Sequence, residues 1–313
     1  RQAEASALAA GDRAVAAGLL STILHIQGDV ARRQGEYAQA GRLLGQALEL
    51  AGDNPQTEAE IRNQLSIIAL AEGDSATANR LSRENLDLYR ATGNKYAMAV
   101  ALNNLGLAAQ RENDQAATRR HFEASLAILR EVGIPYSLAT ALMNAGLVAY
   151  DGGDYAAAQA FQEEALAIRQ ELDDKPGIAA SLNQLATIAQ ARGDLVTAHR
   201  LQSASLIQTR ALGEKVRFGY GLNLMAAIAV EQGRRADRRA LLHRAARLLG
   251  ASAAIFAAMG VIVGPVAARI QERTIGALRE LLDPASLAAA WAAGEALTVE
   301  QALDEALGDL GAP

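Results

Sequence analysis

Apolar residues recur along most of this chain with the spacing of helices. Between residues 102 and 129 they fall three or four positions apart in two runs, and this spacing places each run on one face of a helix. The first run is Leu102, Leu105 and Ala109, and the second is Phe122, Leu126 and Leu129. The pattern predicts two amphipathic helices joined by a short turn.

The turns between such helices recur at a fixed interval. In one set, Gly or Asn is followed by a polar residue, with spacings of 38 and then 40 four times. A second set lies midway, with spacings of 41, 41, 40, 40 and 40. Two turn signals per period indicate two helices per repeat. The first set is Gly35-Glu36, Gly73-Asp74, Asn113-Asp114, Gly153-Asp154, Gly193-Asp194 and Gly233-Arg234, and the second is Gly11, Gly52, Gly93, Gly133, Asp173 and Gly213.

The core positions repeat with the turns, and small residues recur where the two helices of a pair would cross. Small side chains let two helix axes approach closely. The chain is 50% hydrophobic but only 4% aromatic, which suits such packing. We therefore expect an all-α solenoid of about six helix pairs. The core positions are Leu142, Ala145 and Ala149, then Leu182, Leu185 and Ala189, then Leu222, Met225 and Ala229, and the small residues are Gly28, Gly106, Gly146, Ala186 and Ala226.

Several of these residues resemble the tetratricopeptide repeat (TPR). They are Leu105-Gly106 in a first helix, Ala40 followed by Leu44 in a second helix, and Ala47, Ala165 and Ala245. The resemblance covers residues 1–250, with a period of forty instead of 34. This long form is similar to kinesin light chain and to the TPR regions of bacterial signal-transduction ATPases and of LuxR-type or AfsR-type transcriptional regulators. It implies a right-handed superhelix whose first helices line a concave groove that binds proteins or peptides.

The two ends of the chain depart from the repeat. Arg1–Ala10 reads as the tail of a second helix, so we expect residues 1–12 to be the remnant of a truncated repeat, with further sequence upstream. Residues 251–313 lose the period and predict a helical cap. In this cap we expect a helix through Leu282, a break at Asp283-Pro284, a last helix capped by Thr298 and Gln301, and Trp291 as a buried anchor. A homodimer through the truncated end or the C-terminal apolar segment stays open.

One uncharged run, Leu248 to Ala268, is long enough to span a bilayer, which takes about 20 apolar residues. Its many alanines and glycines are only weakly apolar, and Gly264-Pro265 would break a helix there. We favour a buried helix followed by a turn over a membrane span.

Composition excludes several classes of function. The chain has no cysteine and a net charge of -5, so it offers neither disulfides nor thiolate metal sites, nor the basic surface of a nucleic-acid-binding protein. We expect no membrane partner and a cytoplasmic location. The four histidines are far apart, and no cofactor-binding or catalytic motif occurs, so we expect no metal, no cofactor and no enzyme activity. An arginine cluster in residues 234–247 is interpreted as the solvated outer face of a helix.

Asparagines interrupt the apolar faces of the first helices at repeating places. One place holds Asn63, Asn103, Asn183 and Asn223, and the next holds Gln64, Asn104, Asn144 and Gln184. An amide offers donors and an acceptor that suit an extended peptide backbone. By resemblance to the asparagine ladder of kinesin light chain, these residues would read a bound peptide. The candidate binding residues are Asn63, Asn103, Asn104, Asn144, Asn183, Asn223, Gln110, Tyr150 and Gln190.

Two interpretations of the asparagines stay open: they contact a ligand, or they join adjacent repeats by hydrogen bonds. Two functions also stay open. The first is a noncatalytic sensor or docking arm of a larger bacterial regulator, in which binding changes the pitch of the superhelix. The alternative is a freestanding scaffold that assembles proteins without switching.

Overall fold

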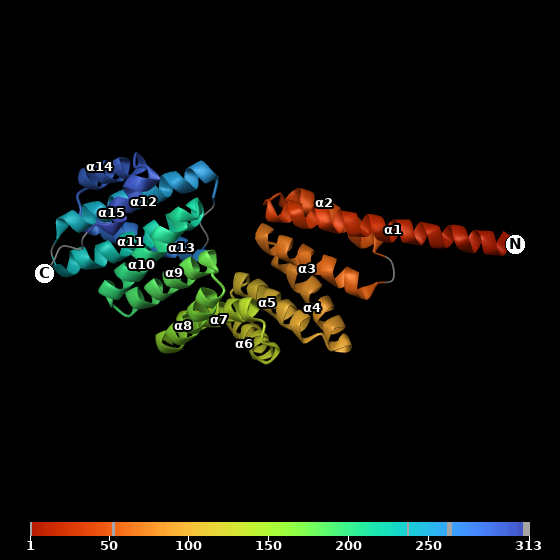
Figure 1. Cartoon of the computed structure of the whole chain (residues 1–313). Helices are drawn as coiled ribbons and strands as arrows, with labels where there is room; N and C mark the ends of the chain where they lie inside the picture. Colours follow the sequence, from red (N-terminus) through yellow and green to blue (C-terminus); the bar gives the residue numbers. More distant parts are fainter. Residues whose placement is uncertain (1, 52–53, 237, 262–264, 309–313) are drawn as a thin grey trace. The chain divides into compact units, whose positions relative to one another are not determined.

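The computed structural model describes residues 2–51, 54–236, 238–261 and 265–308, with side chains from residue 15 onward except at 235–236 and 265–267. Those residues form fifteen α-helices and no strand, and consecutive helices pack in pairs (Figure 1), which confirms the all-α solenoid. The helices are α1 (Gln2–Arg33), α2 (Tyr37–Leu50), α3 (Pro55–Glu72), α4 (Ser75–Thr92), α5 (Lys95–Arg111), α6 (Gln115–Val132), α7 (Pro135–Asp151), α8 (Tyr155–Glu171), α9 (Lys175–Ala191), α10 (Leu195–Ala211), α11 (Lys215–Ala236), α12 (Arg239–Met259), α13 (Pro265–Leu281), α14 (Pro284–Glu295) and α15 (Val299–Leu307).

The chain divides into two compact units, residues 1–148 and residues 149–313. In the first unit α1 packs on α2, α3 on α4 and α5 on α6, and each of α2 and α4 also contacts the first helix of the next pair. The first helices contact one another as well, α1 with α3 and α3 with α5. In the second unit α9, α10 and α11 repeat this arrangement. Within each unit the first helices therefore form a layer of their own.

The turns lie largely where the sequence predicts them. Gly35, Gly73, Gly93, Gly133, Gly153, Gly193 and Gly213 have positive φ, and so do Asn113 and Asp173. An Asp or Asn N-cap follows many of these residues; for example, the Asp74 side chain accepts a hydrogen bond from the Thr77 backbone N–H. Such caps satisfy an orphan donor of the first helical turn. The predicted turn at Gly52 lies outside the described residues.

Two predicted turns are wrong. The helix α1 continues through Gly11, which stands among alanines whose high helix propensity outweighs about 1 kcal/mol for one glycine. The helix α11 continues through Gly233 to Ala236. Gly233 is buried there against Leu242, and a Cβ atom at this position would lie only 2.8 Å from Cδ2 of that residue. It is a packing glycine instead of a turn glycine.

Small residues bring the paired helices together as predicted. A Cβ atom at Gly28 would lie 2.7 Å from Cγ of Leu44, and one at Gly106 would lie 2.5 Å from the ring of Phe122. A buried side chain also donates to a backbone carbonyl at the same place in three repeats. These bonds run from Asn85 Nδ2 to Ala59 O at 2.9 Å, from Ser125 Oγ to Ala99 O at 2.8 Å and from Ser205 Oγ to Ala179 O at 2.9 Å.

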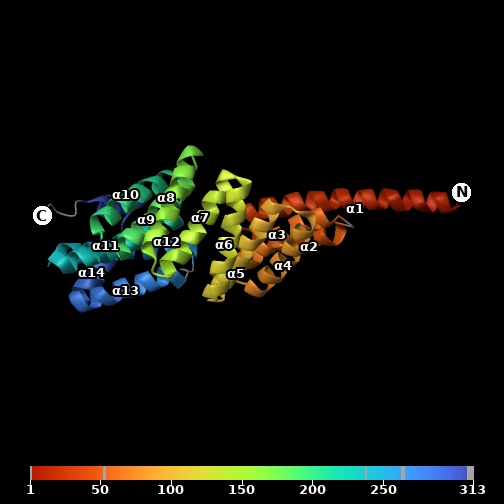
Figure 2. The same cartoon turned by 90° about the horizontal axis from the view of Figure 1, so that it is seen from below.

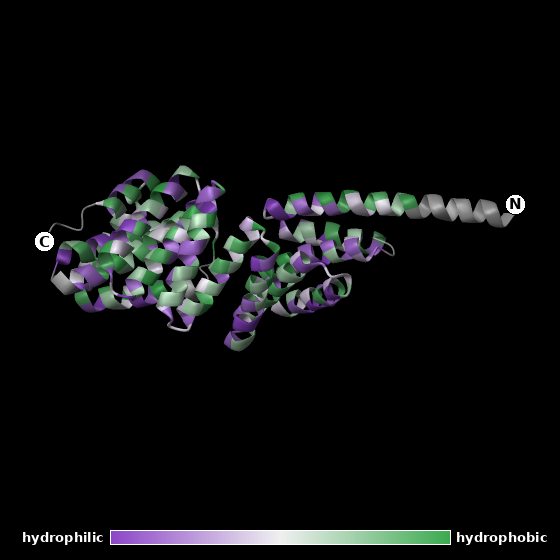
Figure 3. Cartoon of the chain, turned by 60° about the horizontal axis from the view of Figure 1, so that its bottom comes forward, coloured by the Kyte–Doolittle hydropathy of each residue, from purple (hydrophilic) through white to green (hydrophobic). Residues whose placement is uncertain are grey.

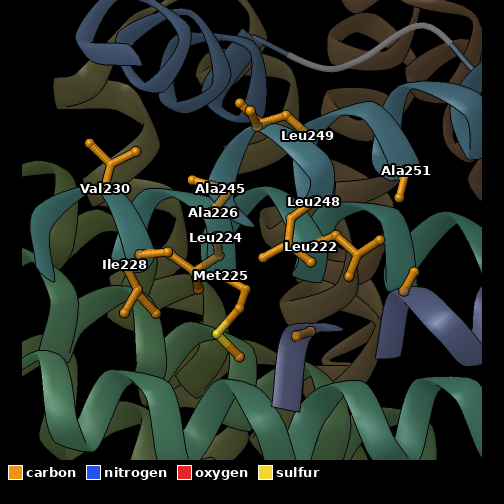
Figure 4. Packing of buried hydrophobic residues seen from close by; sticks show 14 of the residues in the cluster. Leu222, Leu224, Met225, Ala226, Ile228, Val230, Ala245, Leu248, Leu249 and Ala251 are labelled. Atoms are coloured by element: carbon orange, nitrogen blue, oxygen red, sulfur yellow. The ribbon is translucent and has the colours of Figure 1, made fainter. Parts of the chain in front are cut away.

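The largest core of the second unit lies between α11 and α12 (Figure 4), where Leu222, Met225, Ile228, Leu248 and Leu249 are at most 1% exposed. Within the described residues, α12 is the helix long and apolar enough to cross a membrane by composition, and 61% of its apolar window is buried. It ends at Gly260, four residues before the predicted break. The run from Leu248 therefore packs as a core helix followed by a turn, as favoured above.

The C-terminal helices cover α12, which contacts both α13 and α14 (Figure 2). A Cβ atom at Gly294 of α14 would collide with the Arg247 carbonyl, so the two helices touch through their backbones. The break at Asp283-Pro284 and the capping box of Thr298 and Gln301 are confirmed. Trp291 packs against the core only in part, because its Nε1 reaches out to Glu295 Oε1 at 2.9 Å.

The arginine cluster is only in part the solvated face that the sequence suggested, because Arg244 and Arg247 contact α15 instead. Arg244 is 7% exposed and donates from Nη2 to Ala306 O at 2.7 Å. Arg247 donates from Nε to Glu305 Oε1 at 2.9 Å. Both residues hold α15 against α12, an interaction between segments about 60 residues apart that periodicity does not reveal. Arg234 is exposed, as expected.

Candidate peptide-binding face

Half-buried residues line one side of the first helices α3, α5, α7 and α9, whereas residues 221–230 of α11 are all buried. In α5 they are Val100, Asn103, Leu107 and Gln110, which fall three or four positions apart, and the positions eighty residues later in α9 are half-buried too. These are Ala180, Asn183, Thr187 and Gln190. We call this side the first-helix face. It combines aliphatic side chains with amides, a mixture suited to both the side chains and the backbone of a peptide.

The asparagines of the first unit form bonds between consecutive first helices. Asn104 Nδ2 donates to Asn63 Oδ1 at 2.9 Å, which joins α5 to α3. Asn144 Nδ2 donates to Asn103 Oδ1 at 2.6 Å, which joins α7 to α5. The donors Asn104 and Asn144 are buried, with 4% and 7% exposure, whereas the acceptors are half-buried. The structure therefore shows the repeat-joining role for both pairs.

This pairing also fixes the orientation of the two half-buried amides. Because the oxygen of Asn63 and of Asn103 faces the buried amide of the next helix, the amino group is the part of each side chain left to bind something else. Neither amino group donates a hydrogen bond to another described residue. The first unit thus presents two oriented N–H donors at equivalent places in successive repeats.

A third link of this kind lies one repeat earlier. Gln64 Nε2 donates to Asp29 Oδ1 at 3.0 Å and joins α3 to α1. Asp29 also accepts from Arg32 at 2.6 Å and from Arg33 at 2.7 Å. Burial raises the pKa of Asp29, but the hydrogen bonds from these three residues outweigh burial and hold it below its ordinary value. The sequence pattern did not point to Asp29 as a partner, because no later repeat carries a charged residue at its place, which holds Ile67, Leu107, Leu147, Thr187 and Ala227.

The asparagines of the second unit are placed differently. Asn183 Nδ2 donates to Gln202 Oε1 at 2.9 Å, so this bond joins α9 to the second helix α10. Asn223 in α11 is 3% exposed, and neither of its amide atoms has a hydrogen-bond partner in the described part of the chain. Gln202 was not predicted. Its signal is a polar glutamine, shared with Gln162 of the preceding repeat, at a second-helix place where other repeats carry Ser82, Phe122 and Leu242.

The three remaining candidates lie near the end of their first helices. Gln110, Tyr150 and Gln190 are each half-buried. The rings of Tyr150 and Tyr155 lie 5.5 Å apart with a tilt of 51°. Burial is the main reason that the pKa of the Tyr150 hydroxyl is raised above its ordinary value. At neutral pH the phenol is therefore a neutral donor and acceptor.

Acidic residues and histidines do not gather into a metal-binding cluster anywhere in the described ranges. The chemistry of the first-helix face is that of neutral amides, one phenol and aliphatic side chains. Such groups bind through hydrogen bonds and apolar contact, which suits recognition better than covalent chemistry.

Comparison with known proteins agrees with this geometry. The tetratricopeptide repeat family model matches residues 137–206. Residues 137–206 carry tetratricopeptide repeats. No curated protein sequence matches it. Beyond the matched segment, the assignment of TPR-like repeats rests on the forty-residue period and on the repeated helix pairs.

Several solved structures share the fold at low sequence identity. A Rap protein complexed with competence and sporulation factor aligns with a TM-score of 0.61 and 16% identity, over 84% of this chain and 76% of that chain. TPR-like repeats assigned to a kinesin light chain of Podosopora anserina align with a TM-score of 0.50 and 17% identity, over 62% and 96%. A signal-transduction ATPase with a tetratricopeptide repeat sensor from Pyrococcus horikoshii aligns with a TM-score of 0.55 and 15% identity, over 82% and 41%.

Proposed function

We propose that this TPR chain is a noncatalytic module that binds an extended peptide or protein segment along its first-helix faces. The main support for this proposal is the pair of oriented amino groups on Asn63 and Asn103. The oxygen of each side chain accepts a hydrogen bond from a buried amide of the next repeat, which leaves the amino group for a ligand. A backbone carbonyl is the natural partner of such a donor, because every residue of an extended segment supplies one. The candidate contacts of the second unit are Asn183, Tyr150 and Gln190, which are half-buried, whereas the predicted contact Asn223 lies in the core at 3% exposure and is not accessible to a ligand.

The spacing of the donors suits an extended chain. Packed helices lie roughly 8–10 Å apart, which corresponds to about three residues of extended peptide at about 3.4 Å each. Aliphatic residues flank the donors on the same face, including Val100 and Leu107 of α5. The expected ligand is therefore a segment with apolar side chains, whose carbonyls accept hydrogen bonds at intervals of about three residues.

A role as the sensor or docking arm of a larger bacterial regulator is the finer form of this proposal. It is supported by the likeness to the Pyrococcus horikoshii ATPase with a tetratricopeptide repeat sensor. The alignment covers 41% of that ATPase chain. The Rap conjugation gene regulator of plasmid pLS20, which shares the fold with a TM-score of 0.59, was solved in complex with the Phr* peptide, and this is consistent with peptide binding on this fold. In such an arm, ligand binding would bias an attached output domain through its differential affinity for two states.

A substitution at Asn103 separates ligand binding from repeat joining. Asn103→Asp keeps the oxygen that accepts from Asn144 Nδ2, but it replaces the amino group by a second oxygen. We expect peptides selected from a random display library on the unmodified protein to lose at least about tenfold in affinity for this variant, since a carboxylate repels a carbonyl oxygen. The thermal midpoint should stay unchanged.

The matched control is Asn79→Asp on the second helix α4. Asn79 Oδ1 accepts from Arg83 at 2.6 Å, so this exchange also keeps its hydrogen bond and adds the same charge away from the first-helix face. Peptide affinity should equal that of the unmodified protein. Equal affinity for all three proteins would refute the assignment of Asn103. A lower thermal midpoint for Asn103→Asp alone would assign the effect to repeat joining.

A further inference from the structure

Six apolar side chains of α1 are exposed, namely Val15, Leu19, Leu20, Ile23, Ile26 and Val30, at 47% to 65%. Five of them, without Leu20, fall four, four, three and four positions apart and thus share one face of the helix. We call these five residues the α1 stripe. Green along the described part of α1 in Figure 3 marks this apolar character. The sequence from Ala14 to Gly28 holds no Asp, Glu, Lys or Arg. A continuous apolar face of this size typically marks an interaction surface.

Register with the next repeat shows what kind of contact this face makes. The first two repeats are offset by 38 residues, so Ile23 corresponds to Ile61 and Val30 to Ile68 of α3. Ile61 and Ile68 are 0% and 4% exposed, and they belong to one cluster with Leu44 of the preceding helix α2. Two of the five residues of the α1 stripe therefore stand at places by which a later first helix packs on the helix before it. The α1 stripe fits another α-helix with an apolar face.

The order of residues in the stripe is nearly palindromic. Read in either direction it has valine at both ends and leucine or isoleucine between them. Two antiparallel copies would place Val15 against Val30, Leu19 against Ile26, and Ile23 against its own counterpart. Each of these pairs then brings two aliphatic side chains together, and the sequence between Ala14 and Gly28 holds no charged residue that would oppose the contact. A Cβ atom added at Gly18 would meet nothing within 4 Å, which leaves room for a close approach.

We infer that two copies of this chain pair through the α1 stripe, antiparallel and with a two-fold axis beside Ile23. Such an isologous interface uses the same patch on both copies. The stripe and Leu20 would bury about 500 Å² per copy, or about 1,000 Å² in total, which reaches the lower bound for a specific interface. The other long apolar segment, α12, is already covered by α11 and α14 of its own chain. This inference does not depend on the proposed peptide binding.

The absence of cysteine from the sequence permits a direct geometric test by disulfide formation. A disulfide requires Cα atoms within about 7 Å of each other. Under mild oxidation, Ile23→Cys should form a covalent dimer. A mixture of Val15→Cys and Val30→Cys should form a heterodimer, whereas Val15→Cys alone should not. Val196→Cys is the control, because Val196 is 73% exposed on α10 and should stay monomeric on a nonreducing gel. A dimer of Val15→Cys alone would show parallel pairing and overturn the antiparallel arrangement, and no dimer from any variant would overturn the inference altogether.

Light scattering after size-exclusion chromatography tests the association itself. The unmodified protein should elute as a dimer at about 100 μM, and Ile23→Glu should raise the dissociation constant at least about hundredfold because it opposes two carboxylates. Val196→Glu, with the same change on α10, should leave the dimer intact. Circular dichroism should show unchanged helicity in both variants, since both sites are exposed. A monomeric unmodified protein would overturn the inference, and the expected partner of the α1 stripe would then be a helix of another protein.

Discussion

Replacing Asn223 by leucine should stabilise the protein. Asn223 is 3% exposed between Leu222 and Leu224, and neither its oxygen nor its amino group has a partner among the described residues. A buried polar group without a hydrogen bond costs roughly 1–3 kcal/mol, and Leu has nearly the shape of Asn. Imperfect packing of the branched methyl groups would offset part of this gain. We expect a net increase of about 1–2 kcal/mol in the free energy of unfolding.

Urea denaturation followed by circular dichroism measures this change, provided that the slope with denaturant stays the same. The thermal midpoint should rise by about 2–4 °C per kcal/mol for a unit of this size. Asn144→Leu is the matched control. Asn144 is also buried, at 7%, but its Nδ2 donates to Asn103, so its replacement should destabilise by about 1 kcal/mol. Equal destabilisation by both variants would refute the reasoning and show that Asn223 has a partner such as an ordered water.

Three further outcomes follow from packing and charge. Gly106→Ala should lower the thermal midpoint by several degrees, because the new Cβ would meet the ring of Phe122 at 2.5 Å, and Phe122→Leu should restore part of the loss. Gly294→Ala should lower the thermal midpoint further, since its Cβ would collide with the backbone of Arg247. Gly276→Ala on α13 is the control, because its Cβ would meet nothing within 4 Å, and the same melting assay should show a neutral or slightly stabilising effect. Because the folded pKa of Asp29 is depressed, its stabilising effect exists above the unfolded pKa and is lost as the pH falls through the folded value. Asp29→Asn should therefore lower the free energy of unfolding at pH 7, and urea titrations should show this difference shrinking as the pH falls below the ordinary Asp pKa of 3.8.

The fold was largely predictable because its information is local and repeated. A turn signal such as Gly73 followed by Asp74 acts within a few residues, and the forty-residue period multiplies each signal. The failures lie where one residue type has two uses. Gly233 looks like a turn but serves as a packing surface for Leu242, and only the position of the neighbouring helix separates the two.

The candidate site was predictable in its positions but not in its bonds. The period identifies Asn63, Asn103 and Asn144 as equivalent or adjacent places, and the structure shows that they join repeats. The forty-residue period does not reveal that Asn183 donates to Gln202 on the second helix instead. Likewise Arg244 bonds to Ala306 across 62 residues, beyond the reach of any periodic argument. Which amide meets which partner depends on side-chain packing between helices, and the sequence pattern does not encode it.

The affinity of one selected peptide for the Asn63→Asp, Asn103→Asp double variant decides whether these two amides bind peptide backbone. Both oxygens that join the repeats are kept, and both oriented amino groups are removed. We expect a loss of at least about a hundredfold in affinity, about 1.4 kcal/mol or more for each donor, with an unchanged thermal midpoint. Unchanged affinity would show that these amides only join repeats and that the first-helix face of the first unit does not read peptide backbone through them.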